Sequence, residues 1–228
     1  MSNIIDKVSS RGHWHVIIRP KEFKRDHIED ITQLKPIVTE CSVKLRGWDF
    51  PHIDYREEVH IDLDWIEQSL DWNHHVELWR MYQSGQFVFK GGLFHDWIDQ
   101  SDLMKIMGSN QSQTFVSLGD SIYRYTEVFE FASRLALSDA GSPVMHIELS
   151  LLGIKDRILR EDTAKGVPYD ALGRIGIDSV PYKVELSRED LIAQPREYAL
   201  RAMLELFRRF SWNPRIELLR ELQESQLR

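Results

Sequence analysis

The sequence predicts an α+β protein with a mostly antiparallel sheet, packed helices and a helical C-terminus. Several short runs of β-branched and aromatic residues end at turn residues, which is typical of strands. The clearest helical periodicity lies at 121–137 and again from Arg196 onward. The chain has 228 residues, of which 42% are hydrophobic and 29% charged, with only 8 Pro and 12 Gly, so an ordered globular fold is expected.

The N-terminal part of the chain opens with a strand and a helix. The run HWHVIIRP at 13–20 is rich in β-branched and aromatic residues and predicts a buried strand. Residues 27–40 place isoleucine and leucine at helical spacing, with Asp26 as the expected N-cap. Pro36 disfavours a regular helix to the end of that segment.

Alternation of apolar and polar residues predicts two more strands, at 42–49 and at 59–65, the second with a weaker helical alternative. Residues 73–83 fit either a helix that stops at Ser84-Gly85 or the first strand of a hairpin that turns there. Residues 86–89, QFVF, are expected to form a strand in both cases.

The C-terminal part is expected to be richer in helix. After the helix at 121–137, strands are predicted at 144–151 and 181–186. Ser187 is expected to open a helix, with Asp190 near the position of a capping-box acid. A proline at position 195 predicts a break before the main helix, and an amphipathic helix is expected at 216–227.

The polar stretch 108–119, rich in Ser and Gln, is the best candidate for a loop or a boundary between halves. It divides the chain into an N-terminal α+β half, 1–107, and a C-terminal α+β half, 108–228, although one continuous domain is the alternative. Residues 166–178 carry several turn-forming residues and predict a long excursion or a hairpin.

Composition narrows the classes of function. The net charge of -7 disfavours a general affinity for nucleic acid or anionic lipid, since that affinity needs an excess of Lys and Arg. Cys41 is the single cysteine and cannot form an internal disulfide, and no apolar run is long enough to span a bilayer. We therefore expect a cytoplasmic protein without a membrane partner, and no motif indicates a cofactor.

The segment 52–65, HIDYREEVHIDLDW, has the density of His and Asp that a metal-dependent hydrolase or nuclease would need, centred on His60, Asp62 and Asp64. Residues on one face of a strand follow each other at about 6.6 Å, so His60 and Asp64 would lie roughly 13 Å apart and could not both bind one ion. We favour the polar face of a strand and keep the hydrolase as the alternative.

A second pattern favours recognition over catalysis. Arginine, aromatic and amide side chains of the N-terminal half could meet on one sheet and contact a partner protein, a nucleotide or a nucleic acid. For any one of these residues, pairing with the many carboxylates on a solvated face is the simpler interpretation. The predicted binding residues are Arg19, Lys44, Arg46, Trp48, Trp79, Arg80, Tyr82, Gln83 and Gln86.

Three segments, RGHWHVIIRP (11–20), LRGWDFPHID (45–54) and WRMYQSGQF (79–87), resemble a bacterial family of uncharacterised proteins, some of which occur near or fused to predicted ATP-binding or DNA-binding modules. The segment TEVFEFASRLAL (126–137) resembles that family more loosely. The resemblance implies an accessory role, in a prokaryotic mobile-element or defence system, and no catalytic residue. The chain has no nucleotide-binding motif of its own, which disfavours an ATPase. The sequence thus predicts a non-catalytic binding or regulatory module.

Overall fold

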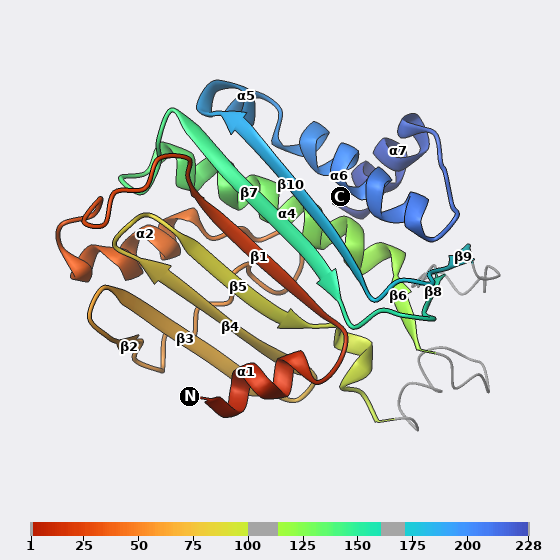
Figure 1. Cartoon of the computed structure of the whole chain (residues 1–228), viewed down its shortest axis with the longest axis horizontal. Coiled ribbons are helices and arrows are strands. Elements are labelled where there is room, and N and C mark those ends of the chain that lie inside the picture. The colour runs from red at the N-terminus through yellow and green to blue at the C-terminus, as the bar shows by residue number, and fades with distance from the viewer. Residues whose placement is uncertain (1, 100–113, 161–171, 228) are drawn as a thin grey trace.

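The computed structural model describes residues 2–99, 114–160 and 172–227 and shows the α+β fold that the sequence predicts (Figure 1). Its main sheet has seven strands in the order β10, β7, β1, β5, β4, β3, β2, and all neighbours in it are antiparallel. The bounds are β1 His13–Pro20, β2 His60–Ile61, β3 Trp65–Trp72, β4 His75–Tyr82, β5 Phe87–Gly92, β7 Val144–Leu152 and β10 Ser179–Ser187.

Strands from both ends of the chain are neighbours in this sheet. β1 pairs with β5 on one side and with β7 on the other, so the sheet joins residues from both sides of position 108. A second, small sheet contains β6 Phe115–Ser117, β8 Ile158–Arg160 and β9 Gly173–Arg174, where β6 and β8 are parallel.

The long helices lie on one face of the main sheet, and Figure 1 shows α4 and α6 behind it with α1 in front of it. There α1 contacts β4 and β5. The helical elements are α1 Ser2–Ser9, η1 Ile31–Gln33, α2 Leu34–Cys41, η2 Phe94–Asp96, α4 Leu118–Leu137, α5 Arg188–Ala193, α6 Pro195–Arg209 and α7 Ile216–Gln226. Among the described residues, no helix has both the length and the apolar character needed to cross a membrane.

The core forms where the sheet meets α4. On β1, Trp14, Val16 and Ile18 are buried on the helix side, as period-two alternation requires. The indole of Trp14 meets the ring of Tyr125 on α4 edge to face, with centroids 5.7 Å apart. Each such ring buries a large apolar area, so this contact fixes the helix against the centre of the sheet.

Four buried phenylalanines extend the same core toward the loop before β2. The ring centroids of Phe50 and Phe89 are 4.9 Å apart, and those of Phe87 and Phe131 are 4.5 Å apart. Phe50 therefore anchors a loop without regular structure to β5 and α4, and the loop takes its place from this packing.

Several expected elements are confirmed. The helix at 121–137 is the central part of α4, and the strands at 13–20, 144–151 and 181–186 are β1, β7 and the inner part of β10. Ser187 caps α5, since its hydroxyl accepts a hydrogen bond from the Asp190 N–H at 3.1 Å. Pro195 is the first residue of α6, where its missing N–H has no consequence.

The helix expected at 27–40 is wrong in its first half. Asp30, not Asp26, is the cap: its carboxylate accepts from the Thr32 N–H at 2.9 Å and opens a short 3₁₀ turn. The regular helix α2 then begins only at Leu34. Pro36 is tolerated because it falls in the first turn, where a backbone N–H needs no helical partner.

Three other expectations are corrected. The strand at 42–49 is reduced to one bridge between Val43 and Phe50, and the strand at 59–65 to the two residues of β2. Of the two alternatives for residues 73–83, the first strand of a hairpin is confirmed and the helix is wrong, because β4 pairs with β5 across the turn at Ser84-Gly85. Residues 108–113 and 166–171, parts of the expected loops, lie outside the described residues.

The phenylalanine core can be tested by truncating one of its rings. We expect Phe89→Ala to lower the free energy of unfolding by about 3–5 kcal/mol, since the ring is fully buried and its removal leaves a cavity. Phe23, which is 79% exposed, is the matched control, and Phe23→Ala should change stability by less than about 0.5 kcal/mol. Urea denaturation of both variants measures the difference, and equal losses would contradict this packing.

Candidate functional site

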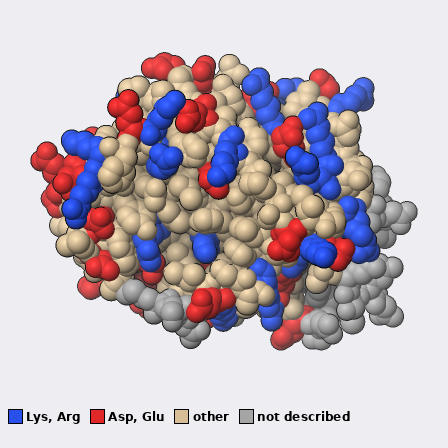
Figure 2. Space-filling model, in the orientation of Figure 1, with Lys and Arg blue, Asp and Glu red and all other residues tan. Residues whose placement is uncertain are grey.

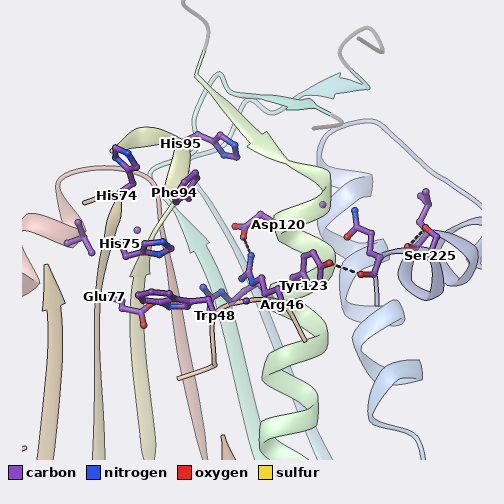
Figure 3. Close-up of a pocket in the computed structure, with 17 residues that line it drawn as sticks. Arg46, Trp48, His74, His75, Glu77, Phe94, His95, Asp120, Tyr123 and Ser225 are labelled. Atoms are coloured by element: carbon purple, nitrogen blue, oxygen red, sulfur yellow. Dashed lines mark hydrogen bonds and ion pairs between the residues drawn. The ribbon is translucent and has the colours of Figure 1, made fainter. Parts of the chain in front are cut away.

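A cavity of about 860 Å³ lies between one end of the sheet and the start of α4. Figure 3 shows its two sides: residues near the β3–β4 turn and in η2 on one side, and residues of α4 on the other. The loop between α2 and β2 forms its floor with Arg46 and Trp48, and the end of α7 contributes Leu222, Ser225 and Gln226.

The sheet side of the cavity is formed by imidazole and phenyl rings. Phe94 in η2 contacts His74 and His75, with ring centroids 5.6 and 5.3 Å apart. The Nδ1 of His74 lies 3.0 Å from the carbonyl oxygen of Trp97. Burial and the nearby charge of Arg46 lower the pKa of His75 to about 4, so His75 is neutral near pH 7.

The helix side is built from one polar face of α4. Asp120 and Arg124 are four residues apart and Glu127 follows three later, a spacing that puts all three on one side of the helix. Tyr123 lies beside them, and its hydroxyl donates to the backbone oxygen of Gln226 at 2.6 Å. This hydrogen bond ties the end of α7 to the cavity wall.

Trp48 on the floor is held by stacking. Its ring lies nearly parallel to the rings of His52 and His75, with both centroid distances 4.0 Å. His52 bonds the carboxylate of Asp49 at 2.8 Å, and its backbone oxygen accepts from the indole N–H of Trp79 at 2.9 Å. Burial opposes protonation of His52, but Asp49 outweighs it and raises the pKa.

Arg46 joins the floor to α4 through two carboxylates. Its Nε and Nη2 donate to the two oxygens of Glu127 at 2.8 and 3.0 Å, and its Nη1 bonds Asp120. Burial would raise the pKa of Asp120, but the charges of Arg46 and Arg124 outweigh that effect and lower it to about 2. All three nitrogens of this guanidinium are therefore occupied.

Glu77 on β4 is the exception in this network. It is only 6% exposed, and its Oε1 has no hydrogen-bond partner. Burial raises the pKa of the Glu77 carboxyl, and Arg124 and His52 oppose this rise. The indole Nε1 of Trp48 lies nearby without a hydrogen bond of normal geometry.

Two further residues that line the cavity have a buried polar atom without a hydrogen-bond partner. The Nε of Arg124 and the Oε1 of Gln226 are buried and have no hydrogen-bond partner. Arg124 instead packs on the rings of Phe50 and Phe89, at 5.0 and 4.8 Å. These atoms have almost no accessible surface, so they lie behind the wall of the cavity and a ligand in the cavity does not reach them directly.

The nine predicted binding residues do not form one surface. Arg46 and Trp48 line the cavity, whereas Trp79 is a core residue. Gln83 donates to the backbone oxygens of Ile28 and Glu29 and so holds a loop.

The remaining predicted binding residues lie elsewhere. Arg80 lies on the opposite face of the sheet, 3.9 Å from the ring of Trp65 and bonded to Tyr82 and Glu67. Arg19 on β1 points to the same face and donates to the backbone oxygen of Pro20. Lys44 is exposed, and Gln86 is half-buried in the hairpin turn.

Charge on that opposite face is mixed. Figure 2 shows Lys and Arg interspersed with Asp and Glu across it, with no separate basic area. Ion pairs such as Lys183 with Glu148, at 2.8 Å, explain the mixture. This arrangement does not favour a phosphate backbone, which binds to gathered cations.

The alternative metal site is not assembled. His60 and Asp62 are exposed, and Asp62 accepts from the Leu63 N–H at the turn into β3. Asp64 is half-buried, and its backbone oxygen bonds the N–H of Gln83. No group of three or more His, Cys, Asp or Glu in the described parts of the chain could hold a metal ion.

Sequence reasoning missed Glu77 and the polar face of α4. The signal on α4 was present: Asp120, Arg124 and Glu127 form a charged stripe on a helix that is otherwise mostly apolar. Glu77 gave no such signal. Its neighbours Val76 and Leu78 on the other face of β4 are also buried, on the side of the sheet that α1 contacts, so the strand shows no alternation of buried and exposed residues there.

Comparison of this chain with protein-family models, with curated proteins and with solved structures finds no match. The site is therefore interpreted from its own geometry.

The Arg46 network should stabilise the fold. Arg46→Ala leaves Asp120 without its partner and Glu127 with only Arg124 at 3.6 Å, and we expect it to lower the free energy of unfolding by about 3 kcal/mol. Arg56 is the matched control, since it also pairs with a carboxylate but its side chain is 86% exposed. Arg56→Ala should leave the urea midpoint close to that of the wild type, and equal shifts would refute a special role for Arg46.

Glu77 should make stability depend on pH in a defined direction. A raised pKa means that ionisation costs the folded state more than the unfolded state, so the unfolding free energy falls as pH rises above the ordinary value of 4.5. We expect Glu77→Gln to match the wild type near about pH 4 and to be more stable by about 1–2 kcal/mol near about pH 8.

The control for this experiment is Glu148→Gln on the opposite face, which removes a carboxylate paired with Lys183 and should give no such gain. Denaturation curves across the pH range measure both variants. A Glu77→Gln variant that loses stability at high pH would mean that the carboxylate has a partner in the folded protein.

Proposed function

We propose that this protein is a binding module that holds a small organic molecule in the cavity between the sheet end and α4. The observation that carries this proposal is one cavity that is lined by aromatic rings and by polar side chains from the sheet end, the loop after α2, α4 and α7. The volume of about 860 Å³ falls within the range of small-molecule sites, roughly 300–1,000 Å³.

The wall has the composition that such sites need. Phe94 and Tyr123 provide aromatic surface together with the edge of Trp48, whose two faces stack on His52 and His75. Polar side chains lie between them. Aromatic surface supports a planar ligand through burial, while the polar atoms fix its orientation. Both features support a ligand with a flat ring and a polar edge.

Phosphate recognition, which would suit a nucleotide, receives less support. A phosphate gains most from a free, accessible guanidinium that binds two of its oxygens. Arg46 already donates to carboxylates through all three of its nitrogens. Arg124 is only 7% exposed, and its guanidinium packs on the rings of Phe50 and Phe89. Binding a phosphate there would displace Asp120 or Glu127 and leave a buried carboxylate without a partner, which is costly.

A partner protein is the second candidate. Tyr55, Ile61 and Leu63 are 68%, 56% and 77% exposed on or beside the short edge strand β2. Exposed apolar side chains at a sheet edge favour contact with another protein chain. A cytoplasmic, non-catalytic accessory role in a prokaryotic mobile-element or defence system accords with both candidates and remains a prediction.

The cavity can be tested with a panel of planar fragments, including the common nucleosides and their monophosphates, by ligand-observed NMR. At least one fragment should bind, and Ser225→Trp, which fills the cavity from α7, should weaken that binding roughly tenfold or more. Glu224→Trp is the matched control, because Glu224 is an exposed neighbour outside the lining. Failure of every fragment, or equal binding to both variants, would refute the proposal.

A further inference from the structure

His75 meets the cavity with the edge of its ring. The imidazole stacks on Trp48, with centroids 4.0 Å apart and planes 11° apart, and Phe94 packs against it with centroids 5.3 Å apart. Figure 3 shows the ring of His75 between those two side chains, on the side of the cavity opposite Asp120. Because aromatic rings lie on either side of it, a ligand reaches this imidazole along its edge, where the two nitrogens are.

Those ring nitrogens are available for hydrogen bonds. His75 is half-buried, and neither nitrogen bonds any residue in the described parts of the chain. Neither is among the atoms shut behind the wall, in contrast to Glu77 Oε1. Burial and the charge of Arg46 lower the pKa of His75 to about 4, and a neutral imidazole has one N–H donor and one acceptor nitrogen. The edge of His75 therefore offers a ligand one donor and one acceptor.

The guanidinium and carboxyl groups on the same wall are already paired or covered. Arg46 pairs with Asp120 and Glu127. Arg124 is only 7% exposed, and its guanidinium packs on two phenylalanine rings. Burial raises the pKa of Glu77, which favours the uncharged form of its carboxyl. A charged ligand would therefore leave water without gaining a free counter-ion, a cost that an uncharged ligand does not have.

We propose that the ligand is an uncharged planar molecule with an amide-like edge, and that His75 forms the hydrogen bond that orients it. This inference rests on the proposed function and adds the chemical class of the ligand. Carboxamides, lactams and nucleobases carry a donor and an acceptor side by side, so they can pair with either nitrogen of the imidazole. The ring of the ligand lies against the aromatic surface of Phe94 and Tyr123. His75 is thus the residue that determines specificity for a polar edge.

Three probes of nearly the same shape test the charge class: benzamide, which is uncharged, benzamidine, which is cationic, and benzoate, which is anionic. We expect benzamide to bind the full-length protein about fivefold or more tightly than either ion, because the ions give up hydration and gain no free counter-ion. Ligand-observed NMR titration at millimolar concentration measures the three affinities. Equal affinities, or tighter binding of either ion, would overturn the inference.

His75→Phe tests the hydrogen bond, since it keeps an aromatic ring between Trp48 and Phe94 and removes both nitrogens. We expect benzamide to bind this variant about fivefold more weakly, the effect of one lost hydrogen bond. Toluene, which has no polar edge, should bind at least as tightly as before, whereas a variant that had only lost structure would weaken both probes. His146→Phe on β7, outside the cavity lining, is the matched control and should keep both affinities.

The outcomes distinguish this inference from the proposed function. If benzamide binds the wild type and His75→Phe equally well, the role of His75 is overturned, while loss of that binding in Ser225→Trp would still support a ligand in the cavity. If benzamide fails to bind, the uncharged class is overturned, and the cavity stays a ligand site only if another fragment of the panel binds. Failure of every fragment would remove the ligand site itself.

Discussion

The buried contact of Arg46 with Glu127 and Asp120 joins parts of the chain that are 81 and 74 residues apart in sequence. It fixes the irregular loop after α2 against the first turns of α4. Because Trp48 follows two residues later, its ring is brought over the start of β4, where it stacks on His75. Together with the packing of Phe50 on Phe89 and Phe131, this pairing holds the floor of the cavity between the sheet and the helix.

The place of the cavity follows from where α4 begins. Ser117 caps the helix by accepting from the Asp120 N–H at 2.8 Å, and this cap sets which residues occupy the first turns. One face of those turns is polar and meets the sheet end, while the later turns bury apolar residues against β1. A single helix thus contributes both to the core, through Tyr125, and to the site, through Asp120 and Tyr123.

Elements whose local signals agreed with their packing were predictable. β7 alternates buried Ile147 and Leu149 with His146 and Glu148 on the other face, and its bounds followed from that alternation. The cap at Ser187 is a contact over three residues, so a sequence pattern contains all of it.

The loop at 42–50 gave the opposite result. It alternates like a strand, but two of its side chains contact distant parts of the chain: Arg46 bonds Glu127 on α4, and Trp48 stacks on His75 of β4. Ladder bonds hold only Val43 and Phe50, so a period of two in the sequence did not produce a strand. Side-chain contacts over long separations outweighed local propensity here.

By itself, the sequence determined the class of fold, the main helix and the central strands, because these depend on periodicity and caps within a short window. It also identified Arg46 and Trp48 as candidate binding residues, because that prediction depends on residue type. Only the tertiary structure decided that Arg46 and Trp48 lie on a cavity while Arg80 and Tyr82 lie across the sheet from it. It also decided that Glu77 is buried with its Oε1 unbonded. The physical reason is that burial and charge pairing depend on which residues meet across the sheet and α4, and no local pattern encodes those distances.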